Sequence, residues 1–245
     1  MSKLILDPAY VPRLSAGTTY YHWPLIDGQN PTSEDIAGKT LGITGSVGWY
    51  GPEYTPSGHA NVVQWAGTTG MGEFYRSDSD LNIGTSNFSF AAWLYLQTEP
   101  ERWNPNLHGI ISKYENSSAS AGYVFMLSSS IFYLTFHKIS PDEYENYTKN
   151  WGTSIFPADE WFHFAVSVER GVLATYYKNA NVIGTQINTG GIVNCTNIGP
   201  FWAGVFPYQA NNWVRLCGRM VDMWFIKRTI TADEVRSMYK FYGTP

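Results

Sequence analysis

The chain has 245 residues, of which 44% are hydrophobic and only 15% are charged, and its formal net charge is −4. This composition excludes an intrinsically disordered chain, and the lack of a basic run argues against nucleic-acid binding. No apolar run is long enough to span a membrane. Aromatic residues make up 16% of the chain. Because aromatic and β-branched side chains suit a pleated sheet, the composition favours an all-β fold.

The first twenty residues are expected to form an extended arm. Residues 1–20 show little periodicity and carry Pro8 and Pro12, each of which lacks a backbone donor, so this segment is no regular central strand. Residues 21–245 show no repeat or linker and are expected to form one domain. Met1–Pro8 holds too short an apolar run for a signal peptide. We therefore expect the chain to stay where it is made, or to leave by a route without a signal peptide, of which assembly into a particle released by lysis is one.

Strand-like segments separated by turn residues follow the arm. Trp161–Glu169 shows the clearest alternation, with an apolar residue at every second position from Phe162 to Val168. A period of two predicts a strand with one buried face. Two segments that flank a Ser-rich turn predict a hairpin. The further strands expected on the same grounds are Phe88–Leu96, Tyr123–Leu127 and Ile131–Phe136 (the hairpin), Val172–Lys178, Val182–Gly184 and a long strand at Val214–Arg228.

One helix is expected near the end of the sequence. Thr231-Ala232-Asp233-Glu234 is a capping box, in which the threonine and the glutamate satisfy backbone donors at the helix start. Val235, Met238 and Tyr239 then follow at spacings of three and four, which place them on one face. We expect a short helix that covers the sandwich.

Together these segments resemble the concanavalin A-like lectin/glucanase superfamily, and specifically its laminin-G-like jelly-roll domains, over about residues 20–240. The resemblance implies an all-β, two-sheet antiparallel jelly-roll sandwich with one short C-terminal helix. The fold hosts lectins, enzymes, adhesion modules and virion proteins, so it implies no single function. The motifs that carry the resemblance are His22–Leu25 with Asp27-Gly28, Asp35–Gly38, Phe88–Leu94, Ile110–Lys113, Trp161–Val166 and Gly218–Asp222 followed by Thr229–Tyr239.

Catalytic chemistry is not expected. Glucanases of the superfamily place carboxylates two and three residues apart on one strand, because acid and nucleophile must flank a glycosidic bond at about 5.5 Å. No such run occurs in this sequence. Asp222 alone lies well inside an expected strand, and it has no carboxylate two residues away. We therefore expect no catalytic residues, although a site split between strands stays an open alternative.

Metal sites have little support in the sequence. The five histidines are scattered without zinc-ligand spacing, and His163 is expected to be a packed, hydrogen-bonded core residue. Asp78, Asp80 and Asn82 offer alternating oxygens in a polar loop, which suits calcium. The alternative is ordinary turn chemistry, since Asp and Asn hydrogen-bond their own backbone. No other cofactor is expected.

Aromatic residues beside amides in loops are the most suggestive feature. Flat rings stack on sugars and amides bind their hydroxyls. The same composition serves a protein interface, and loops that fold back on the sandwich are a third explanation. Nothing in the sequence separates the three. The candidate binding residues are Trp202, Phe206, Tyr208 and Trp213 in one segment, Trp103 and Asn104 in a second, and Trp49 and Tyr50 in a third.

The two cysteines leave a choice open. Cys195 and Cys217 could pair if their strands are neighbours, but buried free thiols are equally consistent with the sequence, because a free cysteine packs as a small hydrophobe.

Two functional hypotheses follow. The first is a non-catalytic phage virion component, a capsid decoration or tail protein at the virion surface, whose partners are its own copies in a homo-oligomer or other virion proteins. The second is a lectin-like adhesion module that binds cell-surface glycans outside the cell. Few charges, the arm and the missing catalytic set favour the first.

Overall fold

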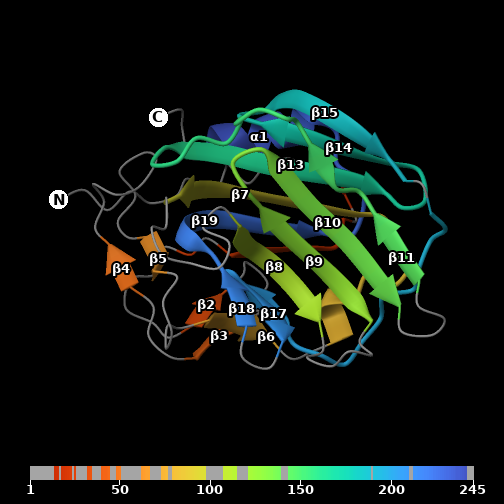
Figure 1. The fold of residues 1–245 in the computed structure, drawn as a ribbon, viewed down its shortest axis with the longest axis horizontal. Coiled ribbons are helices and arrows are strands. Elements are labelled where there is room, and N and C mark those ends of the chain that lie inside the picture. Colours follow the sequence, from red (N-terminus) through yellow and green to blue (C-terminus); the bar gives the residue numbers. More distant parts are fainter. Residues whose placement is uncertain are drawn as a thin grey trace.

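The computed structural model describes residues 14–16, 18–23, 25, 32–34, 40–44, 48–50, 62–66, 73–76, 79–97, 107–114, 121–138, 143–188, 190–209 and 212–241. In these residues the backbone forms two large antiparallel sheets that pack face to face, a separate hairpin and one α-helix (Figure 1). The predicted jelly-roll sandwich with one short C-terminal helix is confirmed.

The first sheet has the strand order β15-β14-β13-β7-β19-β5-β4, and β1 also pairs with β19. In this order its strands are Asn181–Ile187, Leu173–Lys178, Trp161–Glu169, Phe88–Leu96, Cys217–Ile226, Val62–Ala66 and Gly48–Tyr50, with β1 at Tyr20–Trp23.

The second sheet has the order β11-β10-β9-β8-β16-β6-β3-β2, and β12 also pairs with β10. In this order its strands are Glu143–Asn146, Ile131–Lys138, Gly122–Leu127, His108–Tyr114, Phe201–Ala203, Glu73–Arg76, Thr40–Thr44 and Thr32–Glu34, with β12 at Lys149–Asn150. The hairpin consists of β17, Val205–Gln209, and β18, Asn212–Arg215. A short 3₁₀ helix, Ser79–Leu81, precedes β7.

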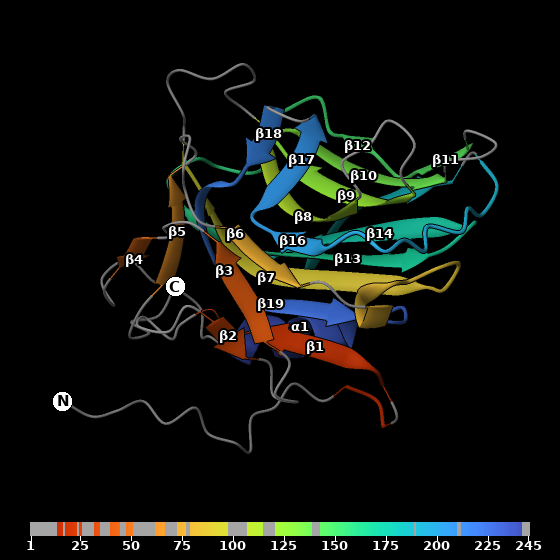
Figure 2. The same cartoon turned by 90° about the horizontal axis from the view of Figure 1, so that it is seen from below.

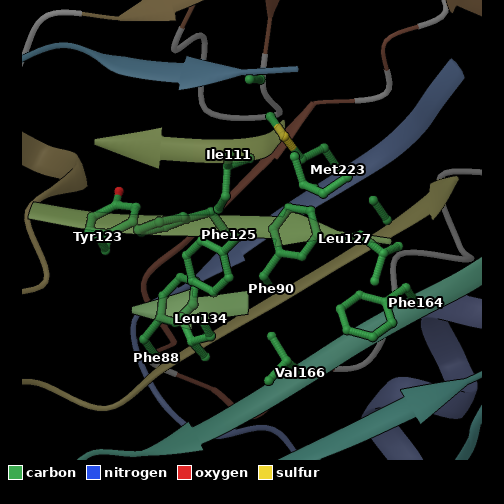
Figure 3. Packing of buried hydrophobic residues seen from close by; sticks show 14 of the residues in the cluster. Phe88, Phe90, Ile111, Tyr123, Phe125, Leu127, Leu134, Phe164, Val166 and Met223 are labelled. Atoms are coloured by element: carbon green, nitrogen blue, oxygen red, sulfur yellow. The ribbon is translucent and has the colours of Figure 1, made fainter. Parts of the chain in front are cut away.

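The core between the sheets is rich in phenylalanine. Phe88 and Phe90 of β7 point into it and pack against Phe125 of β9 (Figure 3). Phe132 of β10 and Phe164 of β13 lie 4.7 Å apart between ring centroids, so each sheet contributes to the same contact. Each such side chain stabilises the fold by about 1.5–3 kcal/mol through burial.

Most of the strands predicted from alternation are confirmed. β7 and β13 have the expected bounds, and β9 and β10 form the expected hairpin. A tight turn joins β14 to β15, where Asn179 and Ala180 adopt positive φ values of 49° and 64°. Side-chain period was therefore a reliable guide wherever a strand has one face on the core.

The expectation of a half-buried β13 is wrong, because its second face is covered by α1, Ala232–Phe241. Ala165 of β13 packs with Val235 and Met238 of the helix in a second hydrophobic cluster. The capping box is confirmed: the Glu234 amide donates to Thr231 Oγ1 at 3.2 Å, and the Thr231 amide donates to Glu234 Oε2 at 2.8 Å. Figure 2 shows α1 and the β17–β18 hairpin on opposite sides of the sandwich.

The expected long strand at Val214–Arg228 is also wrong. The chain leaves β18 at Arg215 and begins β19 at Cys217 in the first sheet. Leu216, between them, is buried, and its amide donates to the Gly204 carbonyl at 2.8 Å. The sequence carries no turn residue that would mark this change of partner, since Val214, Arg215, Leu216 and Cys217 follow one another without Gly or Pro.

The described end of the predicted arm lies on this domain. Leu14 and Tyr20 pack against the cluster beneath α1, and the Lys227 amide donates to the Thr19 carbonyl at 3.0 Å. Tyr20 already belongs to β1. Residues 1–13, the rest of the expected arm at residues 1–20, lie outside the described part of the chain.

Two further expectations can be compared with the described residues. Cys195 and Cys217 are both buried free thiols, which decides between the alternatives that the sequence left open. Within the described residues, no helix combines the length and the apolarity needed to cross a bilayer.

Candidate functional site

Those predicted aromatic residues that the structure describes lie in strands rather than in loops. Trp202 lies in β16 and is half-buried between β6 and β8, opposite Tyr75 and Ser112. Phe206 lies in β17 and is only 7% exposed, so it cannot serve as an exposed anchor. The Gly, Pro and Asn residues of this segment are typical of a loop, but the structure divides the segment into three short strands, and Pro207 lies within one of them.

The other candidates are placed by backbone alone or lie outside the description. Tyr208 belongs to β17, and Trp213 belongs to β18 opposite Pro207. Trp49 and Tyr50 form part of β4, an edge strand of the first sheet. Trp103 and Asn104 lie outside the described residues. The structure therefore groups Phe206, Tyr208 and Trp213 in one hairpin and places β4 in the other sheet.

The hairpin packs on the outer face of the second sheet, and a glycine makes this possible. A Cβ atom on Gly109 of β8 would lie 2.3 Å from the Val214 carbonyl oxygen and 2.9 Å from the Phe206 amide. Ser112 of β8 also donates its hydroxyl to the Val205 carbonyl at 2.9 Å. The β17–β18 hairpin therefore stands against the outer face of the sheet beside β8 and β9, and we call it the wall.

A row of rings begins at this wall and crosses the outer face of the sheet. The strand register places Tyr114 of β8, Gly122 of β9, His137 of β10 and Tyr144 of β11 side by side. Phe206 meets Tyr114 edge to face at 5.7 Å. Tyr114 stacks with His137 at 6.2 Å, and His137 stacks with Tyr144 at 4.3 Å and an interplanar angle of 7°. We call Phe206, Tyr114, His137 and Tyr144 the aromatic row.

Tyr144, the last ring of the aromatic row, is the most exposed of the four. Tyr144 is 54% exposed, whereas His137 and Phe206 are each 7% exposed. His137 stacks with both of its neighbours in the row, Tyr114 and Tyr144. Tyr144 stands on the edge strand β11, where one ring face rests on His137. Stacking on His137 fixes the orientation of the Tyr144 ring before any ligand binds. Binding a ligand on this ring therefore costs little side-chain entropy of the tyrosine.

Exposed apolar side chains gather beside Tyr144. Val172, Ile187 and Ile192 are 51%, 67% and 50% exposed, and we call them the edge patch. The Asn188 amide donates to the Val172 carbonyl at 3.0 Å, which holds the end of β15 beside the β13–β14 turn. The loop that follows passes close to β11, since a Cβ on Gly190 would lie 3.0 Å from the Tyr144 carbonyl oxygen. Apolar side chains exposed on neighbouring segments are typical of binding sites.

The loop beside the edge patch is held by a buried ion pair. Glu145 and Arg170 are both fully buried, and Arg170 Nη2 lies 2.6 Å from Glu145 Oε2. Tyr147 donates its hydroxyl to Glu145 Oε1 at 2.6 Å, and Arg170 donates to the Val193 carbonyl at 2.6 Å. Burial raises the pKa of Glu145, but the hydrogen bonds from Arg170 and Tyr147 outweigh it and hold this pKa below its usual value.

The acid singled out in the sequence is buried as well. Asp222 lies in a β-bulge of β19 with a φ of 55°, a conformation that Asp tolerates better than most residues. It pairs with His22 of β1 and accepts a hydrogen bond from Trp224 Nε1 at 2.8 Å. Burial raises the pKa of Asp222. Its position explains its role in the fold, since it ties β1 to β19, and it offers no carboxylate to an external substrate.

The proposed calcium ligands have other partners where they are described. The Asp80 carbonyl accepts a hydrogen bond from Lys227 Nζ at 2.8 Å, and Asn82 Oδ1 accepts one from the Asn197 amide at 3.2 Å. Asp78 lies outside the described residues. Among the residues that are described, no group of three or more His, Cys, Asp or Glu side chains forms a metal cluster. Calcium at this loop stays a prediction.

Sequence reasoning identified Phe206 but missed Tyr114, His137 and Tyr144, the other three members of the aromatic row. The segment Glu143–Asn146 alternates, but the inward residue is the acidic Glu145 rather than an apolar one, so the hydrophobic pattern points to the wrong face. The inward direction of Glu145 can be predicted only if its buried partner Arg170 is known. Arg170 is 25 residues away in sequence, so the local pattern does not reveal the pair.

Solved structures with the same fold are described as binding domains. The binding domain of Paraclostridial Mosquitocidal Protein 1 matches 93% of this chain with a TM-score of 0.60 and 11% identity. The receptor binding domain of botulinum neurotoxin D matches 90% with a TM-score of 0.61 and 10% identity, and that of botulinum neurotoxin type G matches 92% with a TM-score of 0.54 and 15% identity. The chain spans about half the length of each of these structures, namely 55%, 52% and 53%.

At the level of sequence, no curated protein matches the chain significantly. A family model described as the concanavalin A-like lectin/glucanases superfamily matches residues 70–236, which cover both faces of the core and the start of α1. The chain therefore belongs to the concanavalin A-like lectin/glucanases superfamily.

Proposed function

We propose that this domain is a non-catalytic binding module whose ligand is a carbohydrate, held on the exposed ring of Tyr144. The observation that carries the proposal is the aromatic row, which fixes one tyrosine ring at a sheet edge while leaving the residue 54% exposed. Flat, preorganised rings are what sugar C–H faces stack on. The membership in a superfamily that includes lectins, and the fold shared with structures described as binding domains, support the same function.

The state of the buried acids supports a non-catalytic role. In the described part of the chain, the buried carboxylates are Glu145, Asp222 and Glu234. Each is engaged, with Arg170, His22 and Arg228 respectively. General acid and base catalysis of glycoside hydrolysis needs two carboxylates within reach of the substrate, and none of these three is.

A glycan array followed by calorimetry with a positive glycan tests the proposal. Tyr144→Ala should weaken binding about 30-fold, the effect of losing an aromatic anchor, while Tyr144→Phe keeps the ring and should keep most of the affinity. Val182→Ala is the matched control, since Val182 is also exposed, at 56%, but lies in β15 of the other sheet. Equal affinity of the Tyr144→Ala variant and the native protein would remove the site from consideration.

We also propose a second function, assembly as a phage virion component at the virion surface, in which copies of this chain or other virion proteins are the partners. The edge patch favours it, because Val172, Ile187 and Ile192 expose apolar surface that protein association would bury. Ile187→Ser combined with Ile192→Ser should shift the molar mass in light scattering toward the monomer and leave glycan binding through Tyr144 intact. A monomeric native protein would count against self-assembly.

A further inference from the structure

His163 of β13 is buried without any hydrogen-bond partner for its ring. The side chain is fully buried, and neither Nδ1 nor Nε2 has a partner. Nε1 of Trp93, on the neighbouring strand β7, is also buried without a partner. The prediction of a packed histidine is thus confirmed, but the expectation that it is hydrogen-bonded is wrong. Burying such groups costs free energy that folding elsewhere must offset.

The C-terminal part of α1 seals this region. The Tyr239 ring stacks on Trp93 at 5.3 Å and lies 5.9 Å from the His163 ring, while the rings of Trp93 and His163 are 5.6 Å apart. Tyr239 is the titratable group that faces His163 from the helix, and Trp93 is the group that faces it from β7. From the side of β14, Asn179 binds the His163 backbone amide. Arg236 and Lys240 of the helix are exposed to solvent.

The N-terminal end of α1 is held by a separate set of hydrogen bonds to the Glu234 carboxylate, which we call the latch. Glu234 accepts hydrogen bonds from Arg228 Nη2 at 2.6 Å, from the Thr231 amide at 2.8 Å and from the Ser15 amide at 3.1 Å. Burial raises the pKa of Glu234, but these donors outweigh it and lower the pKa to about 2. The latch therefore keeps its charge in mildly acidic solution.

We propose that the C-terminal half of α1 is an acid-operated lid, which opens when the His163 ring takes up a proton while the latch at Glu234 stays closed. A charged imidazolium has no acceptor in the closed arrangement, so the ring must reach water. Displacing the C-terminal end of α1 is the shortest way for water to reach the His163 ring, because Tyr239 of this end covers it. It would expose the apolar cluster beneath the helix, which includes Ala91, Trp224 and Met238.

The direction and size of the effect follow from linkage. Burial lowers the pKa of His163 from 6.5 to about 3, so the closed lid excludes the proton that the open lid accepts. The closed state is favoured above pH 6.5 and loses this advantage as the pH falls. Between pH 7 and pH 5 the opening equilibrium should rise about 25-fold, if the open ring titrates normally.

Hydrogen exchange, corrected for intrinsic rates, tests the lid in the full chain. Between pH 7 and pH 5, protection of the amides of Met238 to Phe241 should fall about 25-fold, while the amides of β13 keep theirs. His163→Leu removes the titrating ring and should abolish the change. Tyr239→Ala removes the seal and should give the open lid already at pH 7. His108→Asn, which alters another buried histidine at a distance from α1, should leave the lid response unchanged.

The proposal fails under three results. One is constant protection of the helix end from pH 7 to pH 5. Another is loss of protection in β13 together with α1, which would mean global unfolding. The third is an unchanged response in the His163→Leu variant, or, if that variant does not fold, full protection of the helix end in Tyr239→Ala at pH 7.

Discussion

Ser15 and Glu234 lie 219 positions apart in sequence, yet Ser15 donates both its amide and its hydroxyl to Glu234 Oε1, at 3.1 and 3.2 Å. This contact joins the segment before the first strand to the start of the C-terminal helix. It turns a local capping box into a long-range connection, because the same carboxylate also binds Arg228.

Removing this carboxylate should destabilise the domain. We expect Glu234→Ala to lower the free energy of unfolding by about 2–3 kcal/mol, because hydrogen bonds to a charged group are lost together with the helix cap. Asp233→Ala is the matched control, since the Asp233–Arg236 pair is exposed and should change stability by less than about 0.5 kcal/mol. Urea denaturation measures both. Equal effects would show that Glu234 acts only as a surface charge.

Gly122 should not tolerate a side chain. It sits between Tyr114 and His137 in the aromatic row, and a Cβ would lie 2.1 Å from the Lys113 carbonyl oxygen. We expect Gly122→Ala to destabilise the domain by about 2–4 kcal/mol, because β8 and β9 must separate. Gly152→Ala is the control: φ is also positive there, at 70° against 155° for Gly122, but no atom lies within 4 Å of the new Cβ, so backbone strain of about 1–2 kcal/mol is the whole effect. A similar loss in both variants would contradict the steric explanation.

The buried ion pair should matter far more than an exposed one. Arg170→Met leaves Glu145 charged and buried without its partner, and we expect a loss of about 3–5 kcal/mol. Lys138→Met breaks the exposed pair of Lys138 and Glu143. The two side chains are 36% and 44% exposed, so this change should lower stability by less than about 1 kcal/mol. Thermal and urea unfolding of the two variants decide the comparison. Replacing both Glu145 and Arg170 by apolar residues should recover part of the loss.

Global stability should fall in acid, and His108 should contribute. Burial lowers the pKa of His108 to about 4, and its Nδ1 accepts the Cys217 amide at 3.2 Å. The unfolded chain takes up a proton near pH 6.5, which the folded chain refuses until about pH 4, so stability is complete above pH 6.5 and is lost as the pH falls. At pH 5 the loss from this group is about 2 kcal/mol. Asp222 acts in the opposite direction, because its pKa is raised by burial.

The measurement is urea denaturation from pH 7.5 to pH 4.5. His108→Asn keeps an acceptor for the Cys217 amide but removes the titrating ring. Between pH 7.5 and pH 5 this variant should therefore lose about 2 kcal/mol less stability than the native protein. A variant with the pH dependence of the native protein would show that His108 is already exposed or already protonated.

The fold could be predicted from the sequence wherever one rule governed a segment. β7 and β13 alternate because every second residue enters the core, and α1 was visible in its capping box and its apolar face. The prediction failed where two rules compete. Glu145 points inward because it forms an ion pair with the buried Arg170. At the β18–β19 boundary the chain passes from pairing with β17 to pairing with β5, although the sequence suggests one continuous strand.

The candidate site was harder to predict than the fold. Its rings come from β8, β10, β11 and β17, so the aromatic row exists only through strand register. The sequence did identify Phe206, as one member of an aromatic segment, but it assigned this residue to a loop. Tyr144 carried no signal of its own, because a single tyrosine between two glutamates reads as ordinary surface.

The two buried thiols make the protein its own reporter of unfolding. Cys195 is fully buried, and its Sγ donates to the Gly84 carbonyl at 3.2 Å, beside Arg170. Burial raises the pKa of the Cys195 thiol, so both access and thiolate formation oppose alkylation in the folded state. The rate at which a thiol reagent labels Cys195 thus measures how often this end of the sandwich comes apart, without any added probe or engineered residue.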